Sequence, residues 1–152
     1  MVTRKTERHP VFVHTPQLEE SYLASGIGVS GGALSGKVVF TLEDIQQFRL
    51  QEPETPLILI RSDTVPDDIR EISMADGILT GKGGPTSHAA IVAHRLNKTC
   101  VVGCVKMRVW ENDKKCIING HVIRKGDEIS IDGHNGAIYR GMQEIEVVEL
   151  ES

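Results

Sequence analysis

The segment GKGGPTSHAAIVAHR, residues 81–95, combines residue types that could carry out chemistry. It starts with a glycine-rich loop and continues into an apolar stretch typical of a helix, and His88 stands where the two meet. Gly83 and Gly84 can turn the backbone so that several N–H groups point into one space, and such a concave array favours an anion. The loop therefore predicts an anion site beside a titratable side chain.

The helix expected after this loop strengthens the prediction of a phosphate site. Thr86 or Ser87 can cap it, and its first N–H groups lack partners within the helix. The positive end of the helix dipole favours phosphate and disfavours protonation of the imidazole of His88. A neutral ring nitrogen could attack phosphorus while the N–H groups of Gly83 and Gly84 hold the transferred group.

The spacing of the residues alone does not exclude a purely structural role for this loop. Glycine loops before helices are common, and a histidine in a first turn is often only a cap. The loop also lacks the lysine of the GxxxxGK[ST] motif, so it is not a nucleotide P-loop. Lys82 could add positive potential to the site or lie in solvent.

The elements around the loop predict a single α/β domain, with α+β as the alternative. Strands and helices alternate up to residue 104, and Thr41 with Asp44 is typical of a helix cap. Asn119-Gly120 between apolar residues predicts a tight hairpin. We expect a β/β/α arrangement, with the helix after His88 on a sheet and the C-terminal hairpins in a second β layer. The expected elements are a strand at 36–40, a helix at 41–49, a strand at Leu57–Ile60, a helix within 62–73, a strand at 76–80 and a strand at 100–104.

Residues 77–104, GILTGKGGPTSHAAIVAHRLNKTCVVGC, resemble the signature of the phosphohistidine domain of phosphoenolpyruvate (PEP)-utilising enzymes. That family includes pyruvate, phosphate dikinase, PEP synthase and enzyme I of the sugar phosphotransferase system, and its pattern runs G-G-x-T-S-H-A-A-I-x-A-R. DTVPDD upstream and IRKGDEISIDGHNGAIYRG downstream resemble further family segments. The resemblance covers residues 26–141. Within the family, its T-S-H loop and VVGC strand most resemble the central domain of pyruvate, phosphate dikinase.

The resemblance implies a swivelling, three-layer β/β/α domain in which His88 is phosphorylated on Nε2. Gly83, Gly84, Thr86 and Ser87 are then the phosphate-binding residues, and no metal or cofactor belongs to this domain. In plant dikinases the threonine that matches Thr86 is a regulatory phosphorylation site, and for this chain that role stays open.

The resemblance also implies two partners, in cis or in trans. One is an ATP-grasp nucleotide-binding domain that uses ATP and Mg²⁺, and the other is a (β/α)₈ barrel that binds pyruvate or PEP. This chain is then the phosphotransferase component of a dikinase-like system and is not complete alone. The alternative is a non-catalytic swivel module used for docking or regulation.

One departure from the family pattern supports that alternative. The family arginine is His94 here, and Arg95 follows it. Residues one apart do not share a helix face, so Arg95 would be an imperfect substitute. We expect His94 to be a surface residue, and the intact T-S-H loop favours the carrier function.

Composition excludes several classes of protein. The 152 residues carry a net charge of −4 without a basic block, which argues against a nucleic-acid partner. No apolar run has the length of a membrane span, and the start lacks the apolar segment of a secretory signal. The odd number of cysteines, Cys100, Cys104 and Cys116, without a CxxC motif, predicts reduced core thiols and a cytoplasmic protein.

The remaining expectations concern acidic loops and domain limits. Asp63, Asp67 and Asp68 could bind Mg²⁺, but a loop followed by first-turn acids that favour the helix dipole is the preferred interpretation. Asp127 and Asp132 flank an expected hairpin strand, and turn formation explains both. We expect residues 1–25 to be a loosely held arm or linker remnant, 26–141 the phosphohistidine domain, and 142–152 a tail that could add a final strand.

Overall fold

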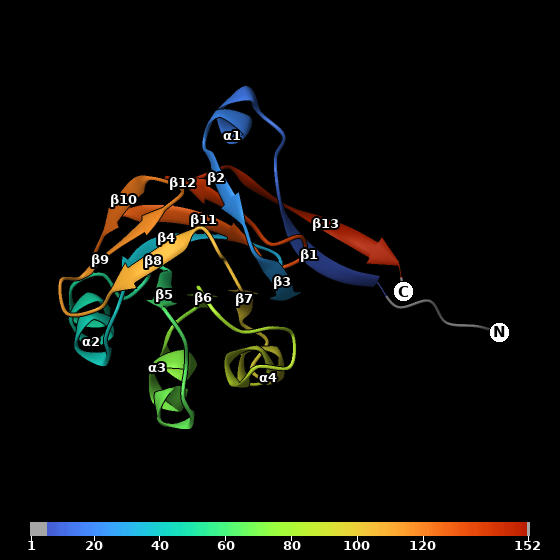
Figure 1. Cartoon of the computed structure of the whole chain (residues 1–152). Coiled ribbons are helices and arrows are strands. Elements are labelled where there is room, and N and C mark those ends of the chain that lie inside the picture. Colours follow the sequence, from blue (N-terminus) through green and yellow to red (C-terminus); the bar gives the residue numbers. More distant parts are fainter. Residues whose placement is uncertain (1–5, 152) are drawn as a thin grey trace.

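A mixed eight-stranded sheet organises the computed structural model, which describes residues 6–151 (Figure 1). The strand order is β2-β12-β11-β4-β5-β6-β7-β3, with β4 to β7 parallel and the outer pairs antiparallel. The strands are β2 (Tyr22–Ser25), β3 (Ile27–Ser30), β4 (Ala33–Val39), β5 (Leu57–Arg61), β6 (Gly77–Thr80), β7 (Thr99–Val102), β11 (Glu128–Asp132) and β12 (Ala137–Arg140).

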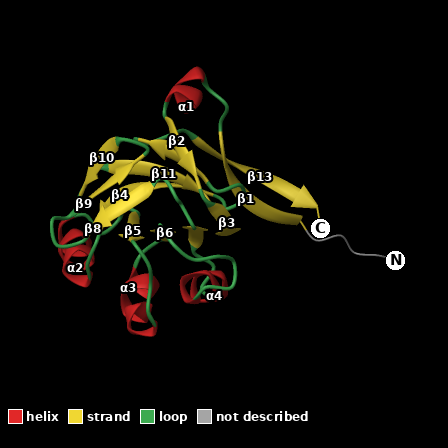
Figure 2. Ribbon diagram, viewed as in Figure 1, coloured by secondary structure: helices red, strands yellow, loops and turns green. Residues whose placement is uncertain are grey.

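The parallel centre of the sheet is built from strand–helix–strand units. The helices α2 (Leu42–Gln51), α3 (Ile69–Met74) and α4 (His88–Arg95) follow β4, β5 and β6 in turn, and all three lie on one side of the sheet (Figure 2). A 3₁₀ turn at Pro66–Asp68 precedes α3. The predicted cap of α2 is confirmed, because Thr41 and Asp44 form a reciprocal capping box.

A second sheet covers the other side of the main sheet. It has the antiparallel order β10-β9-β8 and consists of β8 (Met107–Trp110), β9 (Lys115–Ile118) and β10 (His121–Arg124). Asn119 and Gly120 join β9 to β10 with φ of 48° and 85°, the two positive angles of a type I′ hairpin turn. This predicted hairpin is confirmed.

Side-chain alternation along the buried strands creates two cores. Leu57 and Leu59 of β5 pack towards the helices, whereas Ile58 and Ile60 face the second sheet. Every residue of Leu57–Ile60 is fully buried, as expected for a central parallel strand covered on both faces. The mixed α/β class predicted from the sequence is therefore confirmed.

The predicted content of the second β layer is partly wrong. β8, β9 and β10 form it, but β11 and β12, which we expected there, belong to the main sheet. β11 pairs with β4, from Glu128 opposite Lys37 to Asp132 opposite Ala33. The pairing buries Ile129 and Ile131 in the core beneath the second sheet, so hydrophobic burial decides the assignment.

Residues 6–25, which we expected in a loosely held arm, form regular structure instead. β1 (Thr6–Phe12) pairs with β13 (Ile145–Glu151) in a two-stranded antiparallel ribbon, and α1 (Pro16–Glu20) leads into β2. Leu18 and Leu23 are buried, which fixes this segment to the body. Residues 1–5 of the expected arm lie outside the described residues, and the domain limits at 26 and 141 stay a prediction.

None of the helices within residues 6–151 combines the length and the apolar character needed to cross a membrane.

Candidate functional site

His88 is the first residue of α4, as predicted from the sequence. Ser87 is the N-cap, with extended backbone, and its Oγ accepts a hydrogen bond from the Ala90 N–H at 3.4 Å. The sequence left the cap open between Thr86 and Ser87, and the structure assigns it to Ser87. Thr86 is exposed. The hydroxyl of Ser87, in contrast, already serves the helix.

The glycine loop is anchored at its base and open at its tip. The N–H of Gly81 donates to the carbonyl of Arg61 at 3.1 Å, and that of Lys82 to the carbonyl of Ser62 at 2.9 Å. Gly83 adopts φ of 103°, a conformation that favours glycine, and a Cβ added at Gly84 would meet nothing within 4 Å. The tip therefore has free space around it.

Three backbone donors in this open part lack protein partners. Within the part of the chain that the structure describes, the N–H groups of Gly83, Gly84 and Thr86 donate no hydrogen bond. Such donors beside a helix N-terminus are suited to the oxygens of an anion. The backbone geometry thus supports the predicted phosphate site around His88.

The imidazole of His88 is half-buried, and its Nε2 is covered. Nε2 has no hydrogen-bond partner among residues 6–151, and the structure gives no bond from the ring to the N–H of Gly83 or Gly84. A phosphoryl acceptor needs an accessible ring nitrogen, and the covered Nε2 departs from that requirement, whereas a position of the ring within reach of the N–H groups of Gly83 and Gly84 stays a prediction.

The base of the loop packs against the turn between β7 and β8. Gly103 in this turn has φ of 66°, and a Cβ added there would lie 2.8 Å from the carbonyl oxygen of Gly83. The Thr80 hydroxyl donates to the carbonyl of Lys82 at 2.7 Å, and the N–H of Cys104 donates to the carbonyl of Thr80 at 3.1 Å. These contacts fix the loop on the sheet while its tip stays open.

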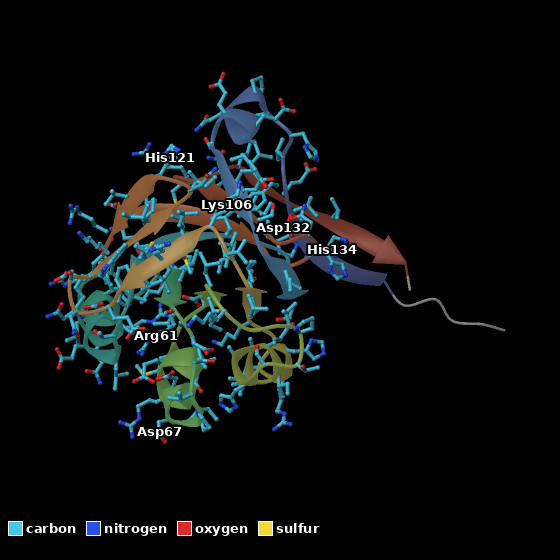
Figure 3. All side chains as sticks on the ribbon, viewed as in Figure 1. Arg61, Asp67, Lys106, His121, Asp132 and His134 are labelled. Atoms are coloured by element: carbon cyan, nitrogen blue, oxygen red, sulfur yellow. The ribbon has the colours of Figure 1, made fainter. Side chains whose placement is uncertain are left out.

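One charged residue beside the loop was not predicted from the sequence. Arg61 ends β5, and its guanidinium pairs with Asp68 at 3.5 Å and Glu111 at 3.6 Å while remaining largely buried. Figure 3 labels it where the helices meet the sheet. Its Nε has no partner in the described chain, whereas its carbonyl accepts the Gly81 N–H. An arginine that ends a fully apolar strand was the signal available in the sequence.

The exposed end of α4 forms a shallow groove with the neighbouring strand. His94 and Arg95 line it together with Ile91, Pro85 and residues 28–29. Both His94 and Arg95 are exposed, so the expectation of a surface position for His94 is confirmed.

The remaining candidate residues have structural roles. Cys100, Cys104 and Cys116 are buried free thiols, and burial raises the pKa of Cys100 and of Cys116 to about 12. Both values mark inert core thiols. Nowhere in residues 6–151 do three or more metal-binding side chains gather.

The acidic loop residues also hydrogen-bond locally. Asp63 accepts from the Thr64 N–H, and Asp68 accepts from the Val65 N–H. Asp127 accepts from the Arg124 N–H, and Asp132 from the His134 N–H. The turn roles predicted for Asp127 and Asp132 are confirmed.

The part of the chain that carries the loop matches a known protein family. The family model "PEP-utilising enzyme, mobile domain" matches residues 53–136, more than half of the chain. The chain therefore belongs to the mobile-domain family of PEP-utilising enzymes.

Curated relatives define the similarity more closely. The chain is 41% identical over 135 residues to pyruvate, phosphate dikinase 1, chloroplastic, from Arabidopsis thaliana, and 40% identical over 135 residues to pyruvate, phosphate dikinase 2 from Zea mays. It is 39% identical over 133 residues to pyruvate, phosphate dikinase from Clostridium symbiosum. These alignments cover 88–89% of this chain but only 14–15% of each relative, so the chain spans about one seventh of their length.

Proposed function

We propose that this chain is a phosphohistidine carrier domain of a pyruvate, phosphate dikinase-like system. It passes a phosphoryl group between an ATP-binding domain and a domain that binds pyruvate or PEP. The observation that carries the proposal is the position of His88, at the first turn of α4 beside three backbone N–H groups without protein partners. The family match and the dikinase relatives support it.

The chemistry assigns each atom of the site a role. The lone pair of His88 Nε2 attacks the phosphorus of the donor, a P–N bond forms, and the P–O bond to the donor breaks with its electron pair leaving on oxygen. Nδ1 keeps its proton. The N–H groups of Gly83, Gly84 and Thr86 hold the phosphoryl oxygens, with Ser87 fixing the helix start. In the second half-reaction an acceptor oxygen attacks phosphorus and the P–N electron pair returns to Nε2.

Because Nε2 is covered, a movement of the His88 ring is the first step of this reaction. The ring has to turn about its side-chain bonds before Nε2 can meet a donor. Because Nε2 makes no hydrogen bond within residues 6–151, the turn breaks none at this atom.

The proposal places the remaining machinery in other domains. ATP and Mg²⁺ belong to an ATP-grasp domain, and pyruvate or PEP to a (β/α)₈ barrel, in cis or in trans. The two sheets and one helix layer of this chain then form a swivelling β/β/α unit that moves between them. The dikinase relatives, about seven times as long as the aligned region, have ample length for such domains. Alone, this chain is not expected to catalyse net turnover.

The test uses labelled PEP and the isolated PEP-binding domain of a pyruvate, phosphate dikinase. Incubated with both, the chain should take up one phosphoryl group that is lost in acid and retained in base, as a phosphoramidate is. His88→Ala should abolish uptake, and His94→Ala is the matched control because it changes an exposed histidine of the same helix. Circular dichroism checks that both variants keep their fold.

Three outcomes would contradict the assignment of the carrier function to His88. Acid-labile label that persists in His88→Ala would move the site to another histidine. A complete absence of label on the wild type, with a dikinase mobile domain labelled in parallel, would favour the docking or regulatory module instead. Acid-stable label at Thr86 or Ser87 would mark an ester rather than a phosphohistidine.

A further inference from the structure

The second sheet presents an outer face of unusual composition. On β8, β9 and β10 the buried positions alternate with positions that point away from the core. Met107, Cys116, Ile118 and Ile123 face inward and belong to the core beneath. By alternation, the outer face consists of Arg108, Trp110, Lys115, Ile117, Val122 and Arg124. We call these six residues the outer face below.

The strand register arranges the outer face in two rows. Arg108 and Val122 flank Ile117, and Trp110 and Arg124 flank Lys115. Directly opposite residues of antiparallel strands lie close enough for their side chains to interact. The Lys115 ammonium lies 5.5 Å from the centre of the Trp110 ring, a cation–π distance. Three cations and three apolar side chains therefore alternate across one surface, with no acid among them.

Charge is distributed unevenly between this sheet and the rest of the chain. Residues 105–125 hold six of the 17 basic residues but only two of the 21 acidic ones, in a chain of net charge −4. Lys114 and Lys125, at the edges of the second sheet, both pair with Asp44. The charges of these two lysines are therefore partly neutralised. Of the two acids in this segment, Glu111 pairs with Arg61 behind the sheet. The cations of the outer face itself have no acidic partner among residues 6–151.

Several apolar side chains on and beside the outer face are exposed to solvent. Trp110 is 39% exposed, Val122 44%, and Val105, just before β8, 87%. Exposed tryptophan and arginine are enriched in protein interfaces, where a large aromatic ring supplies contact area and a guanidinium pairs with carboxylates. Lys106 and His121 border one end of the sheet (Figure 3).

We propose that the outer face is a docking surface for an acidic protein surface that carries carboxylates around an apolar centre. The three cations match the carboxylates, and Trp110 with Ile117 and Val122 matches the apolar centre. An isologous pair of this chain is disfavoured, because it would bring the same cations together. A long polyanion such as RNA is disfavoured by the excess of acids on the remaining surface. The proposal does not depend on the phosphorylation of His88.

The probe for this surface is a fluorescein-labelled peptide of glutamates with interspersed leucines. Its binding to the full chain is measured by fluorescence anisotropy at low and at physiological ionic strength, since salt screens exposed charges. Arg108→Glu combined with Arg124→Glu should weaken binding by about tenfold or more at low salt. Trp110→Ala should weaken it about threefold at both ionic strengths, because its contribution is apolar.

The matched control is Arg70→Glu combined with Arg95→Glu. It changes the net charge by the same amount at two exposed positions on α3 and α4, on the opposite side of the main sheet. The control should bind the peptide within about twofold of the wild type, apart from a general effect of net charge. His88→Ala should bind like the wild type, so this experiment and the labelling experiment fail independently.

Chemical-shift mapping with ¹⁵N-labelled chain locates the contact. The largest peptide-induced shifts should fall on residues 105–124. The proposal is overturned if the control weakens binding as much as the Arg108/Arg124 variant, or if the shifts gather on α3 and α4. It is also overturned if a single-stranded RNA of equal charge binds the same face more tightly than the peptide.

Discussion

Asp44 shows how one residue joins segments that lie far apart in the chain. Its carboxylate accepts the N–H groups of Phe40 at 2.9 Å and Thr41 at 3.1 Å, and it pairs with Lys114 at 3.0 Å. Burial by itself would raise the pKa of this carboxyl. The hydrogen bond from Phe40 and the charges of Lys114 and Lys125 outweigh it, so the pKa of Asp44 lies below its usual value. The ionised form therefore stabilises the fold.

The sign of this shift predicts a pH dependence. A carboxyl whose pKa is lowered on folding adds stability above its unfolded value of 3.8, and this stability is lost as the pH falls through the lower folded value. Asp44→Asn should lower the free energy of unfolding by about 1–3 kcal/mol at neutral pH. It should also flatten the loss of stability in acid. Urea titrations across the acidic range measure both effects, and Asp113→Asn, at an exposed carboxyl, is the control.

A parallel acid slope in Asp44→Asn and in the wild type would contradict the assignment, because the charge would then carry no folding energy.

At the scale of elements, the hairpin between β9 and β10 depends on its turn. Asn119 also ties the turn to the main sheet, because its side-chain amide donates to the carbonyl of Leu23 at 2.9 Å. Gly120 has φ of 85°, and a Cβ added there would meet nothing within 4 Å. Any cost of a side chain at Gly120 therefore comes from backbone conformation alone.

Gly120→Ala should lower the free energy of unfolding by about 1–2 kcal/mol, because an L-residue is strained at this φ. Gly84→Ala is the matched control, since its added Cβ also meets nothing within 4 Å and its φ lies outside the left-handed region. Thermal melts should show a lower Tm for Gly120→Ala and nearly the wild-type Tm for Gly84→Ala. Equal melting temperatures would show that the turn can change its backbone without cost.

At the scale of the whole molecule, removal of residues 1–25 tests the domain boundary that the sequence predicted at residue 26. This segment supplies β2 at the edge of the main sheet and β1 of the ribbon. A chain of residues 26–152 should unfold at a clearly lower temperature than the full chain and expose apolar surface to dye binding. Leu23→Ala in the full chain isolates the buried contribution, and large-to-small substitutions of this kind cost about 2–5 kcal/mol.

If residues 26–152 instead melted like the full chain, the segment would be dispensable, as an arm or linker remnant would be.

The sequence predicted the parts of this molecule that depend on local patterns. The apolar run at Leu57–Ile60, the Thr41 cap and the Asn119-Gly120 turn each depend on neighbouring residues, and all three appear in the structure. The glycine loop and the placement of His88 at a helix start were equally local.

Long-range pairing could not be predicted from such patterns. The pairing of β1 with β13 joins the two ends of the described chain, and β11 reaches back to β4. The β1 segment starts with polar residues and contains Pro10, so nothing in it specifies β13 as its partner. The covered Nε2 of His88 likewise depends on packing around the ring, as does the burial of Arg61 between Asp68 and Glu111.

The ribbon of β1 and β13 has a mechanical consequence. Thr6 lies opposite Glu151 and Phe12 opposite Ile145, so the outer ends of both strands lie together at one point away from the body (Figure 1). A force that pulls the two ends apart acts across the strands and opens their hydrogen bonds one after another, as in unzipping. In optical tweezers the ribbon should therefore open first, at low force and reversibly, before the main sheet ruptures. A single rupture at high force would show that the ribbon shares load with the sheet.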